Sequence, residues 1–295
     1  MSTFKCNGDA NLAEARKYIK KSQSIWAYFS HLENQDQALK YYRSSVNNYK
    51  IEKNITKAIE VDIELYQYLL HIESDFNDVS IDIRDVLEDI AKLYISVGNN
   101  SNAIEYYQIL IKDASNIIKV AKYYSKIGDI SDTFEQRIDS YSKAIEIYSC
   151  ECDHNTDIRI LTERIAEIYL NEMNDFTNAI QYYLKVIECF QNLPNASQSK
   201  YMLTKYYFLT ALLYLSDNTT DAQIYTDRIV NFDPHFSGRQ EYKVLLELID
   251  AVENSNTDKL TEVLIDYDDI YKMTKEMVAV CLKIKRNISN QNIEL

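Results

Sequence analysis

Ala103-Ile104-Glu105-Tyr106-Tyr107 is one copy of a short pattern that recurs along this chain and decides its fold. Variants stand at residues 38–42 (Ala-Leu-Lys-Tyr-Tyr), 144–148 (Ala-Ile-Glu-Ile-Tyr) and 179–183 (Ala-Ile-Gln-Tyr-Tyr). The last three copies start 41 and 35 residues apart, a period typical of stacked helix pairs. The chain is therefore predicted to be all-α, a solenoid of tetratricopeptide-like helical hairpins that form a twisted sheet of antiparallel helices.

A second pattern marks the other helix of each pair. It reads Ile-Ala-Lys-Leu-Tyr at 90–94, Val-Ala-Lys-Tyr-Tyr at 120–124 and Ile-Ala-Glu-Ile-Tyr at 165–169. In two repeats its alanine precedes the alanine of the first pattern by 12 or 13 residues, which is one short helix and a turn. A small alanine lets two helices approach closely, and the larger Ile and Tyr side chains fill the space around it.

The composition agrees with a helical protein and excludes several function classes. The chain of 295 residues has Gly 4 and Pro 2, too few for the turns of a β-sheet protein or for a glycine-rich phosphate loop. Its net charge of -13 argues against general nucleic-acid binding, which requires a basic surface. Five scattered cysteines, with no apolar leader before them, favour a reduced cytoplasmic setting.

The helix pairs are expected to extend over residues 1–230, and three or four short helices in 231–295 to form a C-terminal helical bundle. The first helix is predicted at 11–23. Asp, Asn and Gly predict turns at 51–54, 97–100, 128–129, 152–155, 173–175 and 193–195.

Catalytic and metal chemistry find little support. Cys150, Cys152 and His154 have metal-ligand side chains, but no second Cys/His pair follows at a zinc-finger distance, so a turn is the preferred interpretation. The other histidines are isolated in sequence, without a serine elbow or a Cys-His signature. The sequence predicts a protein that is not an enzyme and has no cofactor and no metal.

Two features point to binding surfaces. A loop near residues 24–30 carries Ile25, Trp26 and Phe29 after a basic helix, which suits shallow insertion into a membrane surface; a hydrophobic staple between the first two helices is the alternative. Charge is also separated along the chain. Basic residues recur in the middle repeats and acidic ones gather near the C-terminal end, although scattered solvated charges would give a similar pattern.

A resemblance to a known family covers essentially the whole chain. Residues 14–29, with Lys-Lys-Ser-Gln-Ser-Ile-Trp at 20–26, resemble the opening helix and membrane-attachment loop of the soluble NSF attachment proteins of the alpha-SNAP type. Residues 120–124 and 205–212 are similar to two internal family segments, and Leu-Lys-Ile-Lys-Arg-Asn-Ile at 282–288 to a third. Their order and spacing match the family.

This resemblance implies an adaptor that binds the assembled SNARE four-helix bundle and recruits and stimulates the hexameric NSF ATPase, so that SNARE complexes are disassembled in vesicle-mediated transport. The implied location is cytoplasmic and peripherally membrane-associated. The implied SNARE-binding residues are Lys119, Lys122, Arg159, Arg164, Lys205 and Arg239; the NSF-binding residues are Asp217, Asp250, Glu253 and Leu295; the membrane contacts are Ile25, Trp26 and Phe29. Of the family's acidic tail, Ile-Glu-Leu at 293–295 remains.

Two alternatives stay open. The gamma form of the attachment protein would keep the fold and change the SNARE preference. A generic tetratricopeptide-like scaffold would instead hold a peptide tail in its groove.

Overall fold

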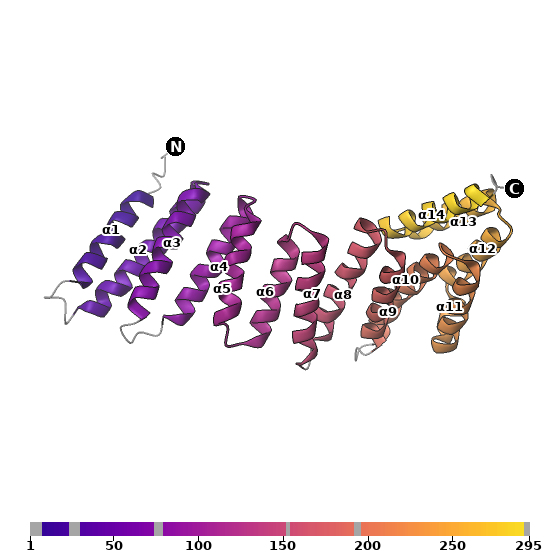
Figure 1. Ribbon diagram of the computed structural model, residues 1–295, viewed down its shortest axis with the longest axis horizontal. Helices are drawn as coiled ribbons and strands as arrows, with labels where there is room; N and C mark the ends of the chain where they lie inside the picture. The colour runs from indigo at the N-terminus through magenta and orange to yellow at the C-terminus, as the bar shows by residue number, and fades with distance from the viewer. Residues whose placement is uncertain (1–7, 24–29, 74–78, 152–153, 192–195, 292–295) are drawn as a thin grey trace. The chain divides into compact units, whose positions relative to one another are not determined.

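The computed structural model describes residues 8–23, 30–73, 79–151, 154–191 and 196–291, and these residues form α-helices with no strand among them. The chain divides into two compact units, residues 1–137 and 138–295. Within each unit neighbouring helices lie side by side and alternate in direction (Figure 1). The predicted all-α repeat architecture is confirmed; the division into a solenoid and a terminal bundle near residue 230 stays a prediction.

The described residues of the first unit form six helices, and the division between the two units falls inside a seventh, α7. They are α1 (Gly8–Ser22), α2 (His31–Ile51), α3 (Ile55–Glu73), α4 (Ser80–Ser96), α5 (Asn100–Asp113), α6 (Ile117–Ile130) and α7 (Phe134–Ser149). Each helix from α1 to α5 packs on the next one in the chain. Alternate helices are linked as well, because the Arg16 guanidinium of α1 pairs with the Glu64 carboxylate of α3 at 2.6 Å and the Tyr123 hydroxyl of α6 donates to Glu88 of α4 at 2.7 Å.

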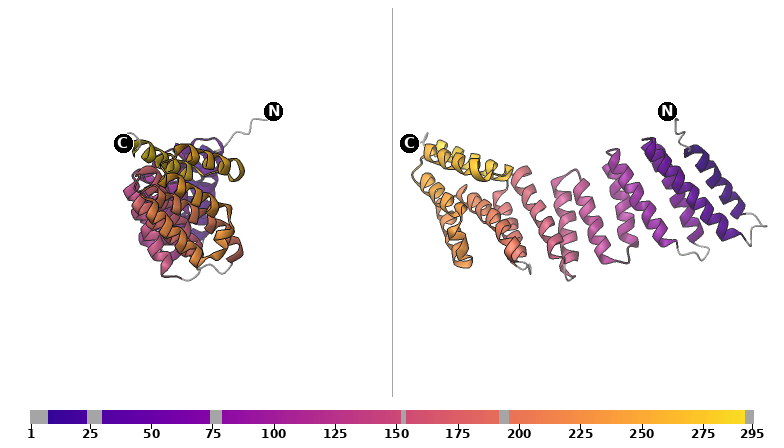
Figure 2. Two further views of the ribbon diagram at one scale, coloured as in Figure 1. Left: turned by 90° about the vertical axis from the view of Figure 1, so that its right-hand side faces the viewer. Right: turned by 180° about the vertical axis from the view of Figure 1, so that it is seen from behind.

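The second unit continues the repeats and ends in helices that cross them. It contains α8 (Asn155–Glu167), the π-helical turn η2 (Ile168–Glu172), α9 (Phe176–Gln191), α10 (Ala196–Leu215), α11 (Thr219–Phe232), the 3-10 helix η3 (Pro234–Gly238), α12 (Gln240–Glu253), α13 (Thr257–Tyr271) and α14 (Lys275–Gln291). Helix α14 lies against α10 and runs across its direction (Figure 2). The Phe208 ring of α10 packs on the Tyr267 ring of α13, with centroids 5.0 Å apart, so α10 anchors the terminal helices.

The recurring alanines lie where helices meet. The alanines of both patterns are fully buried, at 0% exposure: Ala38, Ala91, Ala103, Ala121, Ala144, Ala166 and Ala179. The tyrosines of the first pattern make repeated ring contacts. In the first unit Tyr106 stacks on Tyr94 at 5.7 Å and Tyr107 lies 5.9 Å from Tyr123; in the second unit Tyr182 stacks on Tyr169 at 5.4 Å and Tyr183 lies 6.2 Å from Tyr206. The same residues thus hold successive helices together in both units.

The predicted turns at 51–54, 97–100 and 173–175 agree with helix ends in the structure, and the turn at 128–129 was wrong; the turn at 193–195 and part of the turn at 152–155 lie outside the described residues. The side chain of Asn99 accepts the backbone N–H of Asn102 at the start of α5, and Asp175 accepts that of Asn178 in α9. Residues 128–129 instead lie inside α6, where Gly128 is buried. Helix packing here outweighs the cost of about 1 kcal/mol for a helical glycine. The first helix also begins at Gly8, three residues earlier than expected.

Candidate functional site

Three lysines form a basic line on α6 in the first unit. Lys119, Lys122 and Lys126 are three and four residues apart, so they lie on one side of the helix. The residues on either side of Lys122, Ala121 and Tyr123, are buried, which directs Lys122 to solvent. The Asn116 side chain caps this helix by accepting the backbone N–H of Lys119 at 3.2 Å.

In the second unit, Arg159 is bound by its own neighbours. Its guanidinium donates to the Glu163 carboxylate at 3.1 Å and lies 4.9 Å from the centre of the Phe190 ring, and its side chain is only 16% exposed. The same carboxylate accepts the Tyr206 hydroxyl of α10. Arg159 therefore joins α8 to α9, while Glu163 joins α8 to α10.

Arg164 and Lys205 are brought together around a carboxylate. Both lie within electrostatic range of Glu167, whose pKa is raised by burial and by the charges of Glu163 and Glu276, and lowered again by these two cations. Arg164 also lies over the Tyr141 ring, 5.7 Å from its centre. The basic residues of α8 and α10 thus form a mixed network with carboxylates, and both cations are half-buried.

Arg239 stands apart from this network. It is the exposed residue between η3 and α12, and its side chain makes no cap hydrogen bond there. The preceding 3-10 helix is fixed by Phe236, which is 2% exposed and packs edge-on against Tyr207 and Tyr242. A buried anchor therefore holds Arg239 at the surface.

The expected acidic residues converge at the far end of the second unit. Asp217, in the turn after α10, and Glu253, in the last turn of α12, line one cavity of about 490 Å³. Asp250 lies one helical turn before Glu253 and accepts the Asn254 amide at 3.0 Å. All three carboxylates are exposed. The Asn287 side chain of α14 donates to the Ser216 carbonyl oxygen at 2.9 Å, which fixes the turn that carries Asp217.

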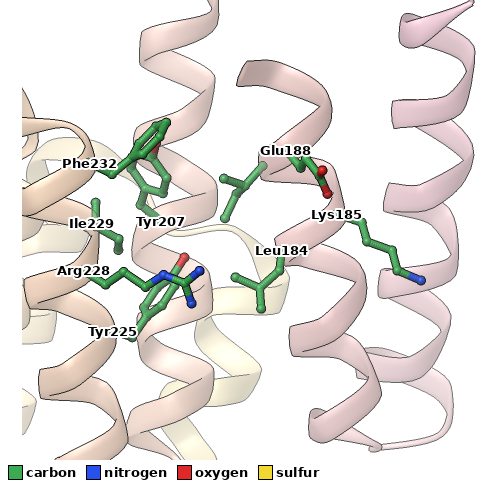
Figure 3. A pocket seen from close by; sticks show the side chains of 9 residues that line it. Leu184, Lys185, Glu188, Tyr207, Tyr225, Arg228, Ile229 and Phe232 are labelled. Atoms are coloured by element: carbon green, nitrogen blue, oxygen red, sulfur yellow. The ribbon is translucent and has the colours of Figure 1, made fainter. Parts of the chain in front are cut away.

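Sequence reasoning missed an apolar groove between α9 and α11, with α10 as its floor (Figure 3). Its volume is about 450 Å³, and Leu184, Ile229 and Phe232 supply apolar walls while Tyr207 lies on α10. Phe232 is 63% exposed, which is unusual for so large a ring. Arg228 lies at the rim. The sequence signal for this groove was Phe232, an aromatic residue just before Asp233-Pro234. The same three residues are also expected wherever a helix simply ends.

Several expected residues lie outside the described part of the chain. They are Ile25, Trp26, Phe29, Cys152 and Leu295. His154, beside Cys152, stacks on Tyr148 at 4.9 Å and its Nδ1 lies 3.0 Å from the Asp157 carboxylate. Among the described helices, none combines the length and apolar composition that a membrane crossing requires.

Comparison with known proteins finds matches over nearly the whole chain. The family model described as "Soluble NSF attachment protein, SNAP" matches residues 7–289. The chain is 24% identical to the alpha-soluble NSF attachment protein of Mus musculus, over 97% of this chain and 96% of the mouse protein. It is 23% identical to a probable vesicular-fusion protein sec17 homolog of Neurospora crassa, over 95% and 96% of the two chains. The chain belongs to the soluble NSF attachment protein family, whose members are non-enzymatic adaptors.

Proposed function

We propose that this protein binds the assembled SNARE four-helix bundle and recruits and stimulates the NSF ATPase, so that the ATPase disassembles the bundle in vesicle-mediated transport. The observation that supports the proposal is the cavity that Asp217 and Glu253 line together, with the exposed Asp250 one helical turn before Glu253, in a chain of the NSF attachment protein family. An acidic surface attracts a basic domain of a partner by electrostatic steering.

The SNARE-binding role is assigned to basic residues of the even-numbered helices. Lys119 and Lys122 of α6, Arg164 of α8 and Lys205 of α10 offer cations to an acidic helical bundle, and Arg239 extends the set. Arg159 contributes indirectly, because its guanidinium is already engaged by Glu163 and Phe190 and joins α8 to α9. Surface pairs are screened within about 8 Å at physiological ionic strength, so binding should weaken as salt is added.

The double variant Lys122→Glu with Lys205→Glu tests the assignment of these cations in both units. It should weaken binding to a SNARE bundle by a few kcal/mol, because like charges then face each other. The control, Lys112→Glu with Lys243→Glu, makes the same change of net charge at exposed lysines of α5 and α12. Titration in solution measures both. Equal affinities for the two double variants would remove Lys122 and Lys205 from the interface.

The acidic surface has its own test. Asp250→Arg with Glu253→Arg should abolish recruitment of NSF to the SNARE-bound protein while SNARE binding survives. Asp266→Arg with Asp269→Arg is the matched control, since these exposed residues have the same spacing on α13. Loss of recruitment in both variants would show a general charge effect and no specific surface.

A second candidate function, a scaffold for a peptide tail, is favoured by the apolar groove between α9 and α11 (Figure 3). An exposed aromatic beside a groove is typical of sites that bind apolar anchor residues. The replacement Phe232→Ser separates the two functions. It should leave NSF-driven disassembly unchanged if the adaptor proposal is right; if disassembly or partner binding fails, the groove is the main binding site.

A further inference from the structure

A small cavity opens between α2, α3 and α4 in the first unit, away from the residues discussed so far. Its volume is about 280 Å³. Helix α2 packs on α3 and α3 on α4, so α3 lies between the other two. The cavity lining combines aliphatic side chains with carboxylates, and Val46, Leu65 and Val86 are buried in it.

The buried acid of this cavity is Asp62 of α3. Its side chain is 3% exposed, and Oδ2 has no hydrogen-bond partner among the described residues. Burial raises the pKa of Asp62 to about 7; the positive charge of Lys50 opposes this rise and the negative charge of Asp89 adds to it. A carboxylate oxygen left buried without a partner is costly, so a cation that reached Asp62 Oδ2 would gain a strong interaction.

Further acids stand along one side of α4. Asp82, Asp85 and Asp89 are three and four residues apart and all line the cavity. Two of them are paired across to α2, where Arg43 binds Asp82 and the Lys50 ammonium lies 3.0 Å from Asp89. Lys92 also reaches Asp89, at 3.8 Å, but it pairs more closely with Glu88, at 3.5 Å.

The charges that face the cavity therefore do not cancel. Four aspartates and one cation, Arg43, line it; Arg43 pairs with Asp82, and Asp89 pairs with Lys50 and Lys92, while Asp62 and Asp85 form no ion pair with the described residues. Asp85 is exposed at the rim, where an entering cation would meet it first. A ligand for this cavity must therefore offer a positive charge to Asp62 and an apolar part to the aliphatic side chains.

We propose that this cavity binds an alkylammonium group, supplied by a lysine side chain of a protein partner or by a free polyamine, with Asp62 as its anion. An ammonium is a compact charge with three N–H donors, so one can reach Asp62 Oδ2 while others meet Asp85 or water. The methylene stem lies along Val46, Leu65 and Val86. The site is independent of the SNARE and NSF surfaces proposed above.

The test uses the full chain and three probes of stated charge. These are acetyl-Gly-Lys-Gly-amide, the same peptide with an acetylated lysine, and spermidine; binding is followed by calorimetry or by chemical-shift titration. The lysine peptide and spermidine should bind and the acetylated peptide should not. Affinity should rise about tenfold between pH 6 and pH 8, because Asp62 must lose its proton to hold the cation.

Variants locate the binding group. Asp62→Asn keeps the side-chain shape and should lower the affinity at least tenfold and remove the pH dependence. Asp85→Asn should weaken binding less, and Glu105→Gln, an exposed change on α5, should have no effect. Tighter binding of spermidine than of the peptide identifies the polyamine as the source, and the reverse identifies the lysine side chain.

Four results would overturn the proposal. Unchanged binding in Asp62→Asn would exclude this carboxylate. If the acetylated peptide bound as tightly as the lysine peptide, the site would recognise the apolar stem and not the charge. If Mg²⁺ or Ca²⁺ displaced the probes at concentrations below those at which the probes bind, the cavity would be a metal site. The pH profile of the unaltered protein gives an independent answer, because affinity that stays flat from pH 6 to 8 also excludes Asp62.

Discussion

The replacement Asp62→Asn should stabilise the protein, and by an amount that depends on pH. Burial raises the pKa of Asp62 from its ordinary 3.8 to about 7. An acid with a raised pKa favours the folded state fully below pH 3.8, and this contribution is lost as the pH rises through 7. A pKa difference of one corresponds to about 1.4 kcal/mol. The difference of about three at Asp62 therefore limits the stability lost above pH 8, compared with low pH, to roughly 4 kcal/mol.

The Asn side chain must itself be accommodated, and Lys50 loses a favourable charge nearby. We therefore expect Asp62→Asn to raise the free energy of unfolding by about 2–3 kcal/mol at pH 8 and by close to zero at pH 4. At about 2 °C or more per kcal/mol, the melting temperature at pH 8 should rise by about 4 °C or more.

Thermal melts of both proteins at several pH values, followed by circular dichroism, measure this effect. Asp85→Asn is the control, since this exposed carboxylate should change stability by no more than about 0.5 kcal/mol. A lower melting temperature for Asp62→Asn at pH 8 would refute the reasoning. So would a difference between the two proteins that is the same at pH 4 and pH 8.

Three further predictions concern other parts of the chain. Tyr206→Phe removes the hydroxyl that binds the Glu163 carboxylate, and should lower the free energy of unfolding by about 1–3 kcal/mol in a denaturant titration; an unchanged value would mean that this bond does not join α8 to α10. Replacing both Ile25 and Trp26 by Ser should spare SNARE binding in solution and reduce disassembly on liposomes, whereas a sharp loss of melting temperature would support the hydrophobic staple. Removing Leu295 should lower the stimulated NSF ATPase rate without loss of recruitment, and loss of recruitment would contradict this.

The repeat architecture could be predicted because alanine recurs at the positions where neighbouring helices pack closely. Ala103 and Ala179 stand at matching places in their repeats, and both are fully buried. Turns were predicted where Asn or Asp caps a helix, as Asn99 does. The same reasoning failed at Gly128, which is buried inside α6, because a buried helical glycine has the same local sequence signature as one that ends a helix.

The acidic surface was predicted residue by residue, but its geometry was not. Asp217 and Glu253 are 36 positions apart, and no local pattern shows that the turn after α10 meets the end of α12. Asp62 was missed for a different reason. It follows Val61 and precedes Ile63 in α3, where Glu60 two positions earlier is exposed, and only the packing of α2 and α4 on α3 buries it.

The adaptor proposal is tested most directly by the rate at which purified NSF takes apart a preassembled SNARE complex in the presence of ATP. Addition of this protein should start disassembly, and the variants at Lys122 with Lys205 and at Asp250 with Glu253 should each fail to do so while their matched controls remain active. A SNARE complex that stays intact when the folded, unaltered protein, NSF and ATP are all present would contradict the account.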